Sequence, residues 1–63
     1  MHIIFEVIEN FEGLSVKGTK KRGNGESTLS KRFTATEVQK LLITKNRLIS
    51  ETTLDMLDEF DKE

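Results

Sequence analysis

The chain has 63 residues, of which 33% are charged, yet its formal net charge is only −1. It contains no cysteine and one histidine, which excludes disulfides, cysteine nucleophiles and thiolate or histidine-rich metal sites. A chain this short buries only about 60% of the surface that its unfolded form exposes. We therefore expect one small domain over residues 1–63, for which a homodimer or a larger complex would supply extra burial.

The sequence predicts a cytoplasmic protein without a membrane partner. Residues 1–6 lack the basic segment and the small-residue cleavage site of a signal peptide. No apolar run approaches the roughly 18 residues that a membrane-spanning helix needs. The absence of cysteine also fits a reducing compartment.

Charge is distributed unevenly along the chain. Residues 1–14 carry −3, residues 15–48 carry +7 and residues 49–63 carry −5, which together give the net charge of −1. A nearly neutral chain therefore has a basic middle and an acidic end, and each could form a charged surface of its own.

The first part of the chain predicts a β-hairpin. Residues 2–9 alternate, with Ile3, Phe5 and Val7 on one face, which is the period of a half-buried strand. Residues 14–19 alternate in the same way after a turn. Strands this close in sequence pair in an antiparallel sense.

A basic segment rich in glycine follows at residues 20–26 and is predicted to be an exposed loop. Residues 28–33 are predicted to form a third strand, with Leu29 and Phe33 turned inward. Lys31 interrupts this inward face and favours an edge position, where charge discourages unwanted pairing.

A first helix is predicted over residues 35–46. Thr34 and Glu37 have the spacing of a capping box, in which each side chain bonds to the other's backbone amide. Leu41 and Leu42 are expected on the inward face of this helix.

A second helix is predicted over residues 51–61, with Ser50 at its N-terminal cap. Its inward stripe is expected to consist of Leu54, Leu57 and Phe60. The complete order is β-β-β-α-α, which predicts an α+β fold of a small antiparallel sheet with helices on one face.

Catalysis is not expected from this set of residues. His2 has neither a cysteine nor a second histidine with which to form a nucleophile–base pair. The acidic residues near the carboxyl end fit a solvated surface, whereas acid–base catalysis needs burial that separates their pKa values. We therefore predict a non-enzymatic protein with no cofactor, no metal ion and no catalytic residue.

The basic middle of the chain provides a candidate nucleic-acid surface. Its members are cations in or near the predicted loop and third strand: Lys17, Lys20, Lys21, Arg22, Lys31 and Arg32. Such a group suits phosphate contacts, although it contains no aromatic side chain on which bases could stack.

The order strand-helix-helix from Thr28 onward is similar to the ribbon-helix-helix family, whose paired strands from a dimer enter the DNA major groove. This resemblance implies a dimeric DNA-binding regulator with Lys31 and Arg32 on the ribbon. It covers only the second half of the chain and leaves the first hairpin without a counterpart.

The acidic second helix provides a candidate protein-binding surface, formed by Asp55, Asp58, Glu59 and Met56. Carboxylates beside an apolar side chain suit a basic surface on another protein, including one made for DNA. The main functional prediction is a small interaction module, an accessory regulator or inhibitor that binds another macromolecule through a charged surface. The alternative prediction is the dimeric DNA-binding regulator.

Overall fold

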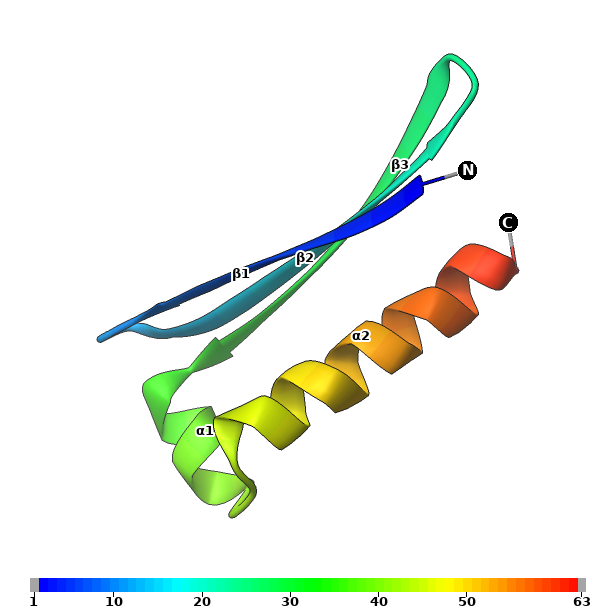
Figure 1. Cartoon of the computed structure of the whole chain (residues 1–63). Helices are drawn as coiled ribbons and strands as arrows, with labels where there is room; N and C mark the ends of the chain where they lie inside the picture. Colours follow the sequence, from blue (N-terminus) through cyan, green and yellow to red (C-terminus); the bar gives the residue numbers. More distant parts are fainter. Residues whose placement is uncertain (1, 63) are drawn as a thin grey trace.

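Three antiparallel strands precede two helices in the computed structural model of the protein, which describes residues 2–62 (Figure 1). The elements are β1 (His2–Asn10), β2 (Gly13–Arg22), β3 (Gly25–Thr34), α1 (Ala35–Lys40) and α2 (Lys45–Asp61). This order confirms the predicted α+β fold. Within residues 2–62, neither helix is long and apolar enough to cross a membrane.

The sheet has the order β1-β2-β3, with both neighbouring pairs antiparallel and β2 in the centre. The pairs Asn10–Gly13 and Arg22–Gly25 close the two hairpins. The strands are therefore longer than predicted, and most of the expected loop over residues 20–26 is strand. Gly23, with φ of 55°, supplies the left-handed backbone that the tight second turn requires.

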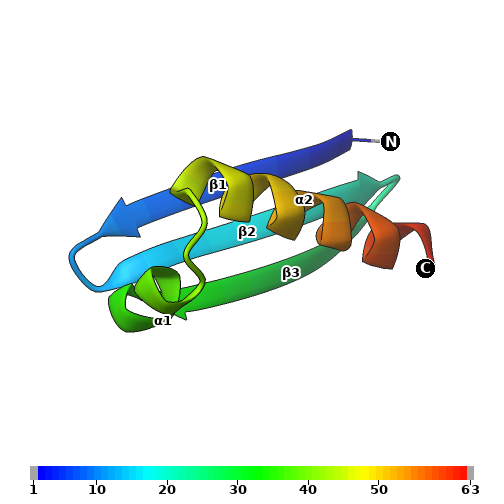
Figure 2. The ribbon, with the colours of Figure 1, turned by 90° about the horizontal axis from the view of Figure 1, so that it is seen from below.

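Helix α2 covers one face of the sheet and packs mainly on the central strand (Figure 2). The buried apolar core is small and consists of Leu14, Val16, Leu48, Met56 and Phe60. Close packing depends on Gly18, because a Cβ atom there would lie 3.0 Å from Phe5 Cε1 and 3.1 Å from Met56 Sδ. The other face of the sheet carries no helix, and we call it the open face.

The start of α1 matches its prediction. Thr34 Oγ1 accepts a hydrogen bond from the Glu37 amide at 3.1 Å, and Glu37 Oε1 accepts one from the Thr34 amide at 3.4 Å. This is the expected capping box. Phe33 and Val38, on either side of it, pack against the core.

The end of α1 and the start of α2 differ from the prediction. Helix α1 ends at Lys40, and α2 begins at Lys45 rather than after Ser50. The N-cap of α2 is Thr44, whose hydroxyl accepts a hydrogen bond from the Arg47 amide at 3.1 Å. Between the helices Leu42 has φ of 55°, which is unusual for a bulky residue. This left-handed conformation lies in the turn that separates α1 from α2.

The inward face of α2 also differs from the prediction. The buried residues are Leu48, Thr52, Met56 and Phe60, which repeat every fourth residue. Leu54, expected inside, is 61% exposed. Leu41 and Leu42 are exposed too, because the helix that was expected to turn them inward ends before them.

Candidate functional site

Three predicted carboxylates form an exposed acidic surface on α2. Asp55, Asp58 and Glu59 are all exposed, and their spacing of three and four residues puts them on one side of the helix. The ion pairs within residues 2–62 are Lys45–Glu9 and Arg47–Glu51. None of the three carboxylates is therefore neutralised by a salt bridge in the described part of the chain.

The apolar member of this surface is Leu54 and not Met56. Met56 is 1% exposed and lies in the core, so it cannot contact a partner as predicted. Leu54 lies on the exposed part of the same helix, four residues before Asp58. We call Leu54, Asp55, Asp58 and Glu59 the acidic surface.

The charges of α2 oppose its backbone dipole. Its first turn contains no acidic residue and its last turn no basic one, although the positive end of a helix dipole is its N-terminus. Neighbouring like charges at positions 55 and 59 add a further repulsion. The acidic surface therefore lowers the stability of the helix that carries it.

A buried lysine of β2 compensates for part of this cost. The Lys20 ammonium donates a hydrogen bond to the Phe60 carbonyl at 2.8 Å, in the last turn of α2. Carbonyls in that turn lack the amide four residues further on that serves the rest of a helix, and a cation there also complements the dipole. The sheet diverges from α2 toward this end, so a long side chain is needed to reach the helix (Figure 1).

The structure corrects the prediction for Lys20, which was expected at an exposed tip. It is 5% exposed, because it follows Leu14, Val16 and Gly18 on the buried face of β2. Extending the two-residue period of β2 past the predicted strand end would have revealed this orientation.

The remaining predicted cations divide between the two faces of the sheet. Lys17, Lys21 and Arg32 lie on the open face, and all three are exposed. Lys31 pairs with Val16 and therefore lies on the side of α2, at the outer edge of β3. Arg22 pairs with Gly25 at the tip of the second hairpin. This tip projects past the first residue of β1, His2, which lies opposite Lys21.

The open face is not uniformly basic. Glu6 lies directly opposite Lys17, and Glu26 lies directly opposite Lys21. Near α1 this face is hollowed over about 460 Å³, between β1 and β3 and next to Arg32. Ile4 and Ile8, which the sequence analysis did not single out as surface residues, are also exposed on this face.

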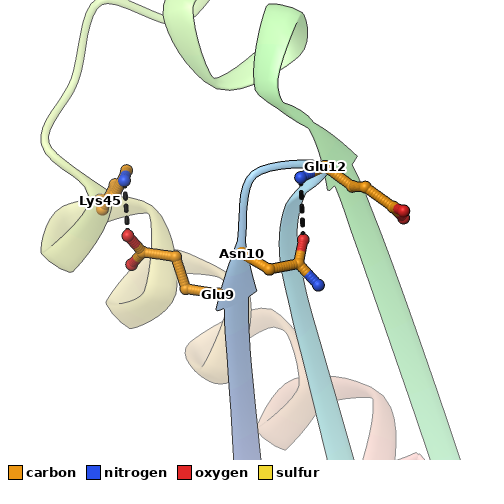
Figure 3. A network of polar contacts seen from close by, with 4 residues as sticks. All are labelled: Glu9, Asn10, Glu12 and Lys45. Atoms are coloured by element: carbon orange, nitrogen blue, oxygen red, sulfur yellow. Dashed lines mark hydrogen bonds and ion pairs between the residues drawn. The ribbon is translucent and has the colours of Figure 1, made fainter.

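Polar contacts fix the end of the molecule where β1 turns into β2 (Figure 3). The Glu12 amide donates to Asn10 Oδ1 at 2.9 Å within the turn, and Glu9 pairs with Lys45 at the start of α2. The Ala35 amide also donates to the Glu12 carbonyl at 3.0 Å, which joins the turn to α1. This end is therefore a scaffold for the sheet and the helices.

The described residues, 2–62, contain no group of three or more His, Asp or Glu side chains that could hold a metal ion. Comparison of the chain with protein-family models, with curated proteins and with solved structures finds no match.

Proposed function

We propose that this protein is a small, non-enzymatic interaction module that binds a basic surface of another protein through the acidic surface of α2. The observation that supports it is an exposed leucine beside three unpaired carboxylates. An apolar contact gives affinity at the centre of an interface, and surrounding charges speed association and select the partner.

The energetic cost of the acidic surface supports the same proposal. Carboxylates at the C-terminal end of a helix and next to one another reduce stability, and neutral side chains there would not. Violations of local stability rules are expected at functional sites. An accessory regulator or inhibitor in the cytoplasm fits this surface, since it needs only to occupy a basic site on its target.

The proposal is tested by comparing immobilised variants as baits in nuclease-treated extract of the source cell. The triple variant Asp55→Asn, Asp58→Asn, Glu59→Gln removes the charge of the acidic surface with little change in shape. If each carboxylate forms one exposed ion pair with the partner, worth about 0.5 kcal/mol, loss of all three lowers the affinity about tenfold. Capture of specific proteins should fall accordingly.

The matched control is the triple variant Glu6→Gln, Glu12→Gln, Glu26→Gln, which removes three carboxylates outside α2 and should retain capture. Equal capture by the wild-type and both triple variants would refute the acidic surface as the binding site. Circular dichroism checks that all baits are folded.

Nucleic-acid binding is the second candidate function, favoured by the position of Lys17, Lys21 and Arg32. They lie on the open face, and α2 covers the opposite face, so phosphates could approach without meeting the acidic surface. In the ribbon-helix-helix family the strand pairs with the same strand of a second chain, whereas β3 pairs with β2 of its own chain. DNA contact is therefore proposed for the open face and not for a ribbon.

This candidate predicts binding to duplex DNA that weakens steeply with salt. Three phosphate contacts correspond to a slope of about −2.7 in a plot of log affinity against log salt concentration. Fluorescence anisotropy measures this slope, and replacing the three cations by glutamine should abolish it. No binding at low salt would eliminate this function.

A further inference from the structure

Exposed apolar side chains gather on β1. Ile4 is 55% exposed, Val7 41% and Ile8 56%. Ile4 and Ile8 lie on the open face and Val7 on the side of α2, because successive residues of a strand point to opposite faces. β-Branched residues of this kind favour strand pairing, because they pack against cross-strand neighbours on each face.

The two edges of the sheet differ in their protection. β3 carries Lys31 on the side of α2 and Arg32 on the open face, both exposed. Charged side chains of this kind discourage the pairing of an edge with another strand.

β1 contains no lysine, arginine or proline over its nine residues, and its two carboxylates each have a lysine beside them, Lys17 opposite Glu6 and Lys45 paired with Glu9. Its outer backbone groups have no strand beside them within residues 2–62. β1 is therefore the edge open to a further strand.

We propose that two copies of this protein associate through β1, which pairs with β1 of the second copy in an antiparallel sense. The twofold axis would run perpendicular to the sheet and join the two three-stranded sheets into one, with both α2 helices on the same side. Such a dimer would satisfy the outer backbone groups of β1 and place the exposed Val7 side chain beside an apolar side chain of the second copy.

The sequence of β1 selects one register. Centring the pairing on Phe5 places Ile3 opposite Val7 of the second copy, Phe5 opposite Phe5 and Ile4 opposite Glu6. Over residues 2–8 of each copy, the side facing α2 then has only apolar pairs across the twofold axis. Cross-strand pairs of this kind stabilise a sheet.

The two neighbouring registers are less favourable. Centring on Glu6 places this carboxylate opposite its own copy, and like charges directly opposite are destabilising. Centring on Ile4 pairs only residues 2–6 of each β1 and leaves Val7 and Ile8 without an opposite residue in β1. Glu6, which the register centred on Phe5 places opposite Ile4, has Lys17 of β2 beside it in its own copy. This lysine provides a countercharge at the interface.

A second copy explains these features better than a foreign strand does. Antiparallel pairing of β1 with itself brings together apolar residues that the sequence already supplies on both sides of the axis. It also brings two α2 helices to one side, which enlarges a core that contains only five buried apolar residues in one chain.

Sedimentation of the purified protein tests the dimer. We expect a concentration-dependent dimer for the wild-type and a dissociation constant raised about 100-fold by Val7→Lys, which places an unpaired cation in the interface. The matched control, Ser30→Lys, adds the same charge to the exposed edge of β3 and should dimerise like the wild-type.

Engineered cysteines test the register, since the natural chain contains none. In the register centred on Phe5, a mixture of Ile4→Cys and Glu6→Cys proteins should form a disulfide between the two variants under mild oxidation. Glu6→Cys alone should form far less linked dimer. Both positions are exposed, so the substitutions leave the core intact.

The proposal is overturned if the wild-type protein remains monomeric up to about 1 mM. A dissociation constant above that value is too weak for the dimer to stabilise the fold. The proposal is also overturned if Ser30→Lys dissociates the dimer and Val7→Lys does not. Efficient linkage of Glu6→Cys with itself would replace the register centred on Phe5 by the one centred on Glu6. Capture of other proteins by the acidic surface is a separate measurement, so failure of the dimer leaves the proposed function standing.

Discussion

At its start α2 is joined to the sheet by Lys45, whose exposed ammonium pairs with Glu9 at the end of β1. Near its other end it is joined by Lys20, which reaches from β2 to the Phe60 carbonyl and is buried. Both contacts link a lysine to an oxygen across the same helix–sheet interface. They differ in their access to water, and this difference determines how much each contributes to stability.

Water screens the Lys45 contact, and both side chains must lose freedom to form it. Such exposed pairs contribute about 0–1 kcal/mol. The Lys20 bond involves a charged donor shielded from solvent, and a carbonyl left there without a partner would be costly. The comparison predicts that the buried contact holds α2 on the sheet, whereas the exposed one makes only a small correction.

Lys20→Met should have the largest effect among three tests of this comparison. Methionine retains an unbranched apolar side chain but leaves the Phe60 carbonyl without its donor. We expect the free energy of unfolding to fall by about 1.5–3 kcal/mol. Urea unfolding followed by circular dichroism measures this change.

Lys17→Met is the matched control, because Lys17 lies on the same strand but on the open face. It should change the free energy of unfolding by less than about 0.5 kcal/mol. Equal effects of the two substitutions would show that the buried bond does not hold α2.

Thr44→Ala should have an intermediate effect at the opposite end of α2. The substitution removes the hydroxyl that accepts from the Arg47 amide, and loss of such a cap costs about 1 kcal/mol. Ser50→Ala is informative as a control, because Ser50 lies inside the helix. It should leave stability unchanged or raise it by up to about 0.5 kcal/mol; destabilisation by Ser50→Ala alone would place the helix start at the predicted residue.

Glu9→Gln should have the smallest effect, a loss of about 0.2–1 kcal/mol at low salt. Because the pair is exposed, the loss should vanish near 1 M salt, where the screening length is about 3 Å. Glu12→Gln serves as control, since the Glu12 side chain makes no ion pair among residues 2–62. A loss for Glu9→Gln that persists at high salt would contradict the weak role of this contact.

The strands could be predicted well because their information is local. Alternation and turn residues define β1, β2 and β3, and the charge of Lys31 correctly indicates an edge strand. The face occupied by Lys20 was missed because a run of basic residues resembles a solvated loop. Only the helix opposite this residue provides the carbonyl that makes its burial favourable.

The helices show where local information is insufficient. The Thr34–Glu37 capping box marks the start of α1, but nothing comparable marks the start of α2 at Thr44. Lys45 and Arg47 follow that cap. Cations are favoured at the C-terminus of a helix, so these two residues predict that a helix ends here and not that one begins. Packing of Leu48 on the sheet and the contact of Lys45 with Glu9 override this preference.

The exposure of the candidate site was predicted correctly for its carboxylates and wrongly for Met56. Asp55, Asp58 and Glu59 are exposed, as their composition suggests. The choice between Leu54 and Met56 depends on the opposing sheet, where Gly18 leaves room for the Met56 sulfur. A sequence pattern does not contain that complementarity.

The short connections within the sheet have a consequence for the order of folding. β1, β2 and β3 are neighbours in sequence as well as in space, so their pairing closes only small loops and should be early. Val16 is buried in a core that α2 completes, and Lys20 meets its carbonyl 40 residues further along the chain. During synthesis the sheet therefore emerges with its apolar face bare, and docking of α2 is the step that protects a nascent chain from aggregation.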